Sequence, residues 1–288
     1  MTIIANQVDV VVRFHDVSRL AELERCLFSL VGQDYRPLHI ILVVQRFSDA
    51  DIERTYSSLL PLFGLDQAPS FEILNWEHEA PLDARSALIN LGISAAKGRF
   101  LAFLDFDQAL YPEAYRLLVS QLQSAGADIA FAKVRRVEME AFSSFLHSRA
   151  MLPSAECASL RDLFTGNVCP LHSFMVDRTR IPEQLLFFEP YLMVEEAYDF
   201  LLRICAQFRS DFTLARAGIG EYHDRIDSAN AQDNVSVRHE GRILYKHEAA
   251  FVEQRRRNTP LSEPVRRALG IVPLQINLSI RDYLDGAS

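Results

Sequence analysis

The strongest constraint on the fold of this chain is the alternation of short apolar runs with amphipathic segments in its first half. Five runs read as strands: 8–14, 39–45, 71–77, 100–106 and 128–134. The first two are too continuously apolar to keep one face in water, which is typical of parallel strands covered on both sides. Helical patterns lie over 19–33, 83–97 and 112–124, the first with Ser18 as its expected N-cap. This alternation predicts an α/β domain built on a largely parallel sheet with right-handed crossovers.

Beyond Met139 the pattern becomes less regular. A loop-rich stretch at about 143–190 leads to a strong helical pattern over 194–208, and a second helical pattern over 242–258 precedes a tail punctuated by prolines. We expect a main domain over residues 1–235 and a helical C-terminal tail over 236–288.

Composition narrows the class of protein. A chain of 288 residues that is 49% hydrophobic can bury a large core, and a net charge of −8 excludes a nucleic-acid binder for the bulk of it. Its four cysteines form no CxxC pair, which argues against a disulfide framework or a zinc site and suits a reducing compartment. No apolar run approaches the about 20 residues that span a bilayer, and the first residues lack the pattern of a signal peptide. We therefore expect a cytoplasmic protein.

The tail contains a basic run, "EQRRRN" at 253–258. Such a run could contact an anionic lipid surface at the inner face of the membrane, without a transmembrane segment. The alternative is a solvated helix end, which needs no partner.

Two aspartates stand at the end of the fourth predicted strand. Asp105 and Asp107 project to the same side of an extended backbone because of their i, i+2 spacing, and ligands of parallel α/β sheets bind at the carboxyl ends of strands. Two carboxylates about 4 Å apart repel by roughly 4 kcal/mol at an effective dielectric near 20. A divalent cation with a preference for oxygen ligands, Mn²⁺ or Mg²⁺, would turn this repulsion into attraction. The alternative is that Asp105 caps a turn and Asp107 is solvated.

The surrounding segment, "RSALINLGISAAKGRFLAFLDFDQALYPEAY", resembles the inverting glycosyltransferases of family 2, which have the GT-A fold. The family's N-x-G-[IL]-x-x-A-x-G helix end and its D-x-D motif are matched by Asn90, Gly92, Ile93, Ala96, Gly98, Asp105 and Asp107. "VDVVVRFHD", "TGNVCPLHSFMVDR", "VEEAYDFLLRI" and "YHDRIDSAN" resemble further family segments, in the family's order, over about residues 7–235. The resemblance implies a Rossmann-like, mostly parallel central sheet flanked by helices.

The resemblance also implies a nucleotide-sugar donor whose diphosphate is held by Mn²⁺ or Mg²⁺. Asp107 would be the main metal ligand, Asp105 would contact the metal or the ribose, and His223 would be a third ligand or a diphosphate contact. The implied donor-binding residues are Arg13, Phe14, His15, Gln45, Arg85, Asn90, Asp105 and Arg225. At the family's V-V-D-D-G-S position the chain instead has Gln45 and Arg46, so the chemistry of the nucleotide pocket is altered.

An inverting transfer needs a base that takes the proton of the acceptor hydroxyl. Glu196 fills the family's Glu position, whereas Ala197 stands where the family's Asp often acts as the base. We therefore expect Glu196 to be the base, with Glu195 in reserve. The alternative is that both carboxylates only complement a helix N-terminus.

The expected function is a metal-dependent, inverting, hexosyltransferase-type glycosyltransferase in the assembly of surface polysaccharides, with a glycan, lipid-linked or other glycoconjugate acceptor. A second hypothesis is a non-catalytic module that binds a nucleotide-sugar or glycan, favoured by Gln45, Arg46, Gln108 and Ala197. A third, a sugar-phosphate nucleotidyltransferase, is disfavoured because no glycine-rich loop follows the first strand.

Overall fold

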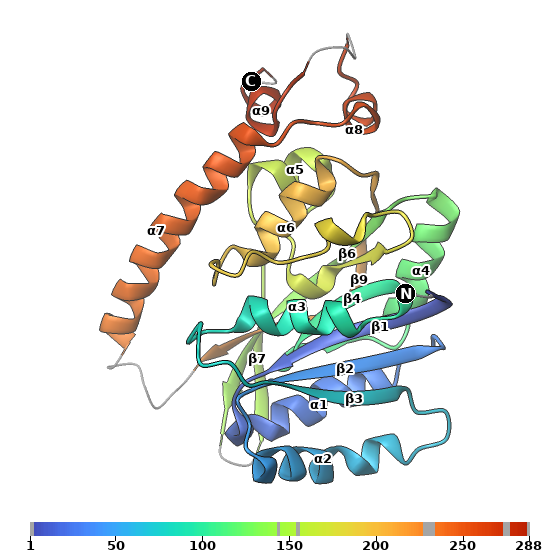
Figure 1. Ribbon diagram of the computed structural model, residues 1–288, viewed down its shortest axis with the longest axis vertical. Coiled ribbons are helices and arrows are strands. Elements are labelled where there is room, and N and C mark those ends of the chain that lie inside the picture. Colours follow the sequence, from blue (N-terminus) through green and yellow to red (C-terminus); the bar gives the residue numbers. More distant parts are fainter. Residues whose placement is uncertain (1–2, 143–144, 154–155, 227–233, 273–276, 287–288) are drawn as a thin grey trace.

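The computed structural model describes residues 3–142, 145–153, 156–226, 234–272 and 277–286, without the side chains of 141, 226 and 234–245 (Figure 1). Within these residues nine strands form one sheet, in the order β3-β2-β1-β4-β8-β6-β9-β5, with β7 paired to β6. Helices cover both faces of the sheet (Figure 1). The α/β class predicted from the sequence is confirmed.

The first half of the sheet is parallel, as the alternation predicts. It consists of β1 (Ile4–Phe14), β2 (Leu38–Gln45), β3 (Ser70–Trp76) and β4 (Gly98–Asp105). The pairs β1–β2, β2–β3 and β1–β4 are all parallel. Their carboxyl ends therefore meet at one edge of the sheet, which places the ends of β1 and β4 side by side.

The second half of the sheet is mixed, which the sequence did not predict. A short strand, β8 (Phe174–Asp177), lies between β4 and β6 (Ile129–Ala141) and is antiparallel to both. The long strand β9 (Ser210–Ile226) is parallel to β6, whereas β5 (Ala109–Leu110) and β7 (Leu146–Leu152) are antiparallel to β9 and β6. The predicted strand 128–134 exists as part of β6, but it does not neighbour β4.

The helices form two groups. On one face lie α1 (Leu20–Val31), α2 (Asp49–Phe63) and α4 (Ala114–Ala125), and on the other α3 (Arg85–Ala95), α5 (Leu160–Thr165) and α6 (Glu196–Cys205). Short 3-10 turns occur at Val17–Arg19, Leu171–Ser173 and Glu183–Leu185. Successive side chains of β1 point to opposite faces of the sheet. Val11 packs with α3, whereas Val10 and Val12 pack with α1. Both faces of the central strands are buried for this reason.

One local expectation needs correction, and one helix was missed. Ser18 does not cap the first helix; instead the Asp16 carboxylate accepts hydrogen bonds from the Ser18 N–H (3.0 Å) and hydroxyl (2.6 Å). Helix α2 was not predicted, and it contains Pro61. Its start is nevertheless marked in the sequence, because Ser48 and Asp51 form a capping box.

The C-terminal segment packs onto the main body. It consists of α7 (Asn234–Asn258), α8 (Glu263–Ala268) and α9 (Ile280–Gly286). The side chains of Val252, Leu261, Val265 and Ile280 belong to the same buried cluster as those of α5 and α6. In the part of the chain that the structure describes, no helix is long and apolar enough to cross a membrane.

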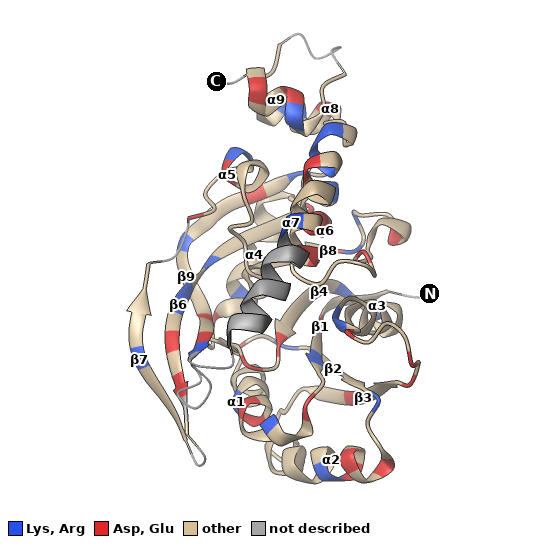
Figure 2. Cartoon of the chain, turned by 90° about the vertical axis from the view of Figure 1, so that its left-hand side faces the viewer, with Lys and Arg blue, Asp and Glu red and all other residues tan. Residues whose placement is uncertain are grey.

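The arginines of the basic run 253–258 mostly bind other residues of the same chain. Arg255 forms an ion pair with the buried Asp199 (2.6 Å), and Arg256 donates to the Tyr198 hydroxyl (2.7 Å). Arg257, the most exposed of the three, pairs with Glu253. Figure 2 shows both signs of charge at this end of α7. Two of the three arginines thus stabilise the contact of α7 with the body.

Two glycines of the family-like motif stand where helix and sheet approach each other closely. A β-carbon on Gly92 of α3 would overlap both methyl groups of Val11, and one on Gly98 would lie 2.7 Å from the Gln7 carbonyl oxygen. Close packing of the helix and the sheet therefore requires glycine at these two positions of the motif.

We expect Gly92→Ala to destabilise the fold by about 1–3 kcal/mol, because the added methyl overpacks the contact of α3 with β1. Chemical denaturation would measure this loss. Gly286→Ala, where no atom lies within 4 Å of the added carbon, is the control, with a change within about 0.5 kcal/mol. Equal stability of the two variants would show that α3 can move away from β1 at little cost.

Candidate active site

The candidate site begins where β1 and β4 end. Arg13 of β1 stands in register with Asp105, the last residue of β4, and Asp107 follows in the turn before β5. Both aspartates therefore lie at the carboxyl end of a central strand, beside the end of the first strand.

Arg13 connects two acidic residues of the site. Its Nε and Nη2 donate to the two carboxylate oxygens of Asp105, and its Nη1 donates to Glu196 Oε1 at 3.0 Å. Burial by itself lowers the pKa of Arg13, but the two carboxylates outweigh it and raise that pKa. Likewise, burial raises the pKa of Asp105, but Arg13 outweighs it and the net pKa is lowered. Asp105 is thus held as a carboxylate.

Asp107 is in a different electrostatic state. Its carboxylate accepts from Arg19 (3.2 Å) and Gln108 (2.8 Å), and its side chain is 27% exposed. Burial, with the charge of Asp105 added to it, raises the pKa of Asp107. Of the two aspartates, Asp107 is therefore the one whose charge is less fully compensated, because Arg19 offsets burial and Asp105 only in part.

His223 is buried and bonded at both ring nitrogens. Its Nδ1 lies 2.7 Å from the Asp107 carbonyl oxygen and 3.0 Å from Arg25 Nη2, and its Nε2 lies 3.0 Å from Glu221 Oε2. A metal could bind this ring only by displacing one of these partners. Arg225, two residues on, donates to Glu22 at 2.8 Å. Residues 227–230 of the predicted "YHDRIDSAN" element lie outside the described residues.

The structure brings together no complete set of metal ligands. In the described ranges, no group of three or more His, Cys, Asp or Glu side chains could hold a metal ion. The carboxylate oxygens of Asp105 accept from Arg13, and those of Asp107 accept from Arg19 and Gln108, so a cation on Asp107 would have to displace or share one of these partners. A single protein carboxylate fits a cation that takes its other ligands from substrate phosphates and water.

Gln45 and Arg46 contact a protein loop. Arg46 donates to the carbonyl oxygens of His78, Glu79, Pro81 and Leu82, and it does so from a backbone φ of +54°. Gln45 donates to Leu82 O at 2.8 Å. These two residues, which stand where the family has acids, hold the loop that precedes α3.

Arg85 and Asn90 of α3 contact the chain before α6. Asn90 exchanges two hydrogen bonds with the backbone of Phe188 (2.8 and 2.7 Å). Arg85 pairs with Asp83 (2.8 Å) and donates to the carbonyl oxygen of Met193. Arg85 also faces the cavity, whereas Asn90 does not line it.

The remaining two residues of the predicted donor site differ in burial. Phe14 is fully buried and packs edge-on against Phe47 and Phe106. His15 lies half-exposed against Phe106, and burial, with Arg19 and Arg85 nearby, lowers its pKa. Phe14 therefore supports the site from the core, and His15 lies closer to its surface.

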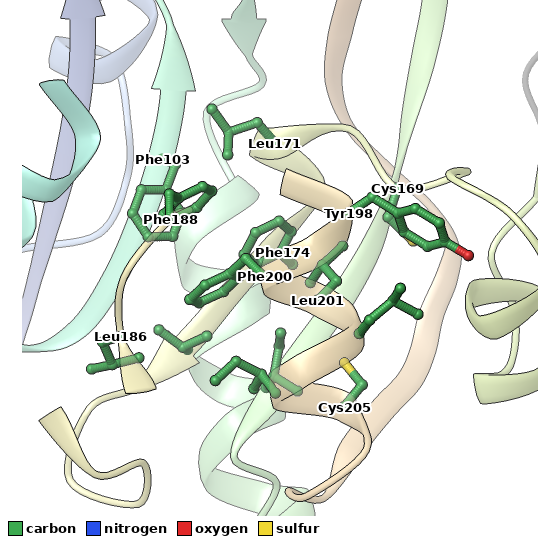
Figure 3. Packing of buried hydrophobic residues seen from close by; sticks show 14 of the residues in the cluster. Phe103, Cys169, Leu171, Phe174, Leu186, Phe188, Tyr198, Phe200, Leu201 and Cys205 are labelled. Carbon is green, nitrogen blue, oxygen red and sulfur yellow. The ribbon is translucent and has the colours of Figure 1, made fainter. Parts of the chain in front are cut away.

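Helix α6 directs Glu196 toward the cavity. Tyr198, Leu201, Leu202 and Cys205 are buried in one cluster, and Figure 3 shows Phe200 of the same helix packed beside Phe174 and Phe188. Successive residues are about 100° apart around a helix axis, so Glu195 and Glu196 point in different directions. Glu196 lines the cavity, whereas Glu195 accepts a hydrogen bond from Asn167 (2.9 Å). Burial raises the pKa of both carboxyls, and Arg13 only partly offsets this at Glu196.

The cavity encloses about 500 Å³ between the strand ends, β6, β9 and α6. Its walls bear both signs of charge, and Tyr222 offers a partly exposed ring. The lining includes Arg13, Arg85, Asp105, Lys133, Arg136, Glu156, Glu196, Tyr222 and Asp224. Mixed charges with an aromatic ring suit a polar, hydroxyl-rich ligand.

The family model described as "Glycosyl transferase family 2" matches residues 9–179, more than half of the chain. The chain belongs to glycosyl transferase family 2. The match spans both aspartates and ends before α6, so the family model itself does not reach Glu196.

Curated relatives of this family 2 chain match over shorter stretches. The succinoglycan biosynthesis protein ExoO of Rhizobium meliloti is 30% identical over 116 residues, which are 38% of this chain and 33% of that protein. The uncharacterized glycosyltransferase YibD of Escherichia coli is 28% identical over 109 residues, 38% of this chain and 29% of that protein. The chain thus aligns with about a third of the length of either relative.

Solved structures confirm the GT-A fold. S. aureus TarS 1–349, in a complex with UDP-GlcNAc, superposes with a TM-score of 0.60 at 15% identity, over 91% of this chain and 71% of that one. The mannosyltransferase PcManGT of Pyrobaculum calidifontis, in a complex with GDP-Man and Mn²⁺, gives a TM-score of 0.51 at 12% identity, over 77% and 58%. Together with family membership, these likenesses support a glycosyltransferase.

Several residues at this family 2 site were not found from the sequence. Arg19 ends the 3-10 turn before α1, Arg25 lies within α1, and both contact Asp107. His172 is buried beside Asp105, and burial lowers its pKa to about 4, so it is neutral at pH 7. Arg19 and Arg25 could have been found as basic residues that follow the first strand closely in the sequence. No local sequence pattern indicates a role for His172.

Proposed function

We propose that this protein transfers a sugar from a nucleotide-sugar to a hydroxyl of a glycan or glycoconjugate, with inversion. The observation behind this proposal is that Arg13, Asp105 and Glu196 line one cavity at the carboxyl ends of β1 and β4, in a chain of glycosyl transferase family 2. The UDP-GlcNAc and GDP-Man complexes of the structural neighbours support a nucleotide-sugar as the donor.

In this proposal Glu196 takes the proton of the acceptor hydroxyl, and Arg13 and Asp105 orient the groups around the reacting carbon. Arg13 also keeps negative charge on Glu196, because an adjacent cation favours the ionised form. Asp107 would hold Mn²⁺ or Mg²⁺ against the donor diphosphate, and the cation would neutralise charge on the leaving group. The Mn²⁺ in the PcManGT complex supports this use of a divalent cation.

A thermal-shift panel tests the proposed donor site. The full chain is heated with UDP-, GDP-, CMP- and dTDP-sugars, each with and without Mn²⁺. We expect one nucleotide class to raise the melting temperature, and to raise it further with Mn²⁺. No shift with any nucleotide-sugar would reject the proposal.

We expect Asp107→Asn to remove the Mn²⁺-dependent part of that stabilisation while leaving the fold intact, because a partly exposed strand-end carboxylate contributes little to packing. The measurement is the melting temperature with nucleoside diphosphate, with and without Mn²⁺. Asp34→Asn, which removes an exposed carboxylate that pairs with Arg116 and does not line the cavity, is the matched control. An unchanged Mn²⁺ effect in Asp107→Asn would assign the cation to another ligand.

A second candidate is a binding module that recognises a nucleotide-sugar without transfer. It is favoured by the ion pair between Glu196 and Arg13 and by Ala197 in place of the family's Asp. The two candidates differ in turnover. Nucleotide binding without any release of nucleotide from the sugar would favour the module.

A further inference from the structure

A carboxylate of the C-terminal helix binds the chain at the start of α6. Glu248 of α7 is 4% exposed. Its oxygens accept hydrogen bonds from the backbone N–H groups of Met193 (2.9 Å), Val194 (2.8 Å) and Glu195 (2.8 Å). Hydrogen bonds from N–H groups to an ionised acceptor are stronger than neutral ones, and three consecutive donors fix the direction of the chain that supplies them.

This contact bonds one of the N–H groups at the start of α6. The first N–H groups of a helix have no partner within the helix, and Glu195, at the N-cap position of α6, makes no side-chain cap. Its N–H group is bonded by Glu248, 53 positions later in the chain, and the other two N–H groups that Glu248 binds belong to the residues just before the helix. Glu248 also places a negative charge near the positive end of the helix.

The other side of the same segment is held by α3. Ser86 donates to the carbonyl oxygen of Leu192 at 2.9 Å, and Arg85 donates to that of Met193. The carbonyl groups of Leu192 and Met193 are therefore bonded by α3, and the N–H groups of residues 193–195 are bonded by α7. Glu196, the next residue, begins α6 and lines the cavity.

We propose that Glu248 is a positioning residue for catalysis: it sets the direction of the α6 N-terminus, and so holds the Glu196 carboxylate in the cavity beside Arg13. This inference rests on the proposed function, with Glu196 as the base. It gives α7 a role in the transfer step. This helix lies beyond residues 9–179, which the family model matches.

The test uses the full chain and the nucleotide-sugar that the thermal-shift panel selects, with water and a set of methyl glycosides as acceptors. Glu248→Gln keeps the size of the side chain, but its amide NH₂ would face backbone donors. We expect kcat for nucleotide release to fall about 10- to 100-fold, the scale of a small misplacement of a catalytic group. The KM for the donor and the Kd for the nucleoside diphosphate should stay within about threefold, because Arg13, Asp105 and Asp107 lie at the ends of β1 and β4 and not on the segment that Glu248 holds.

Glu253→Gln is the matched control. It removes the same charge from the same helix, but Glu253 pairs with Arg256, Arg257 and Arg281 away from the cavity, and we expect the wild-type rate. If Glu248→Gln does not yield folded protein, Glu248→Asp replaces it. This variant keeps the anion but withdraws it by one methylene, so the same selective loss of kcat is expected, smaller in size.

Three outcomes would overturn the inference. They are a wild-type kcat in folded Glu248→Gln, a fall in kcat that only parallels weaker nucleotide binding, and an equal fall in Glu253→Gln. No nucleotide release by the wild-type chain from any donor would instead reject the proposed function, and the catalytic role of Glu248 with it.

Discussion

Glu196→Gln should lower the rate of sugar transfer by 10²-fold or more, the scale expected for the loss of a general base. The substitution preserves the shape of a buried side chain, and Arg13 keeps its two bonds to Asp105. Donor binding should therefore persist, and the loss should appear in kcat. Steady-state nucleotide release and calorimetric titration with the nucleoside diphosphate would measure the two quantities separately.

Glu195→Gln is the natural control for this substitution. Glu195 is also buried at the start of α6, but its carboxylate is bonded to Asn167 and does not line the cavity. We expect its rate to stay within about tenfold of the wild type, since it does not take the proton. A large loss in Glu195→Gln alone would assign the base to that residue. If neither substitution affects an active enzyme, another group takes the proton.

Arg13→Met has the second largest expected effect. Burial raises the pKa of Glu196, and Arg13 lowers it in part. A base acts only when it is deprotonated, so the wild-type rate should fall at low pH with a midpoint above the ordinary carboxyl value of about 4.3. Removing Arg13 removes the interaction that lowers this pKa. The midpoint should therefore move to higher pH, and the rate at neutral pH should fall because a smaller fraction of Glu196 is deprotonated.

The same variant should be less stable. Breaking a buried ion pair by removing one partner costs about 3–5 kcal/mol, and here two carboxylates lose their partner. Arg13→Lys, which keeps the charge but not the fork geometry, should retain more of the pH profile than Arg13→Met. A pH profile that is identical in the wild type and Arg13→Met would contradict the role given to this arginine.

The parallel half of the fold could be predicted because β1, β2 and β4 are continuous apolar runs that must be covered on both sides, and the half-buried β3 still carries a recognisable apolar pattern. The runs that became β1, β2, β3, β4 and part of β6 were all found. The strand β8 has only four residues, Phe174–Asp177, within a loop-rich stretch, so it has no period to detect. Its place between β4 and β6 is set by tertiary contacts, which the local sequence pattern does not reveal.

The site could be predicted only where a local motif marks it. Asp105 and Asp107 were found because two carboxylates interrupt an apolar run. The bonds that Arg13 makes span 92 residues to Asp105 and 183 to Glu196, and those of Glu248 span 53 to 55. Side-chain partners at such separations follow from the assembled fold. Gln45 and Arg46 were noticed as departures from the family, but their contact with the loop before α3 needed the structure.

Release of nucleotide from a nucleotide-sugar tests the central claim most directly. The wild-type chain with Mn²⁺ is compared with Glu196→Gln, which serves as a folded blank. We expect the wild type to release nucleotide from one donor class, faster with a glycoside acceptor than with water, and Glu196→Gln to release it at least 10² times more slowly. Saturable binding of a nucleotide-sugar by the wild type, with no release above the blank, would contradict the claim that this cavity catalyses sugar transfer.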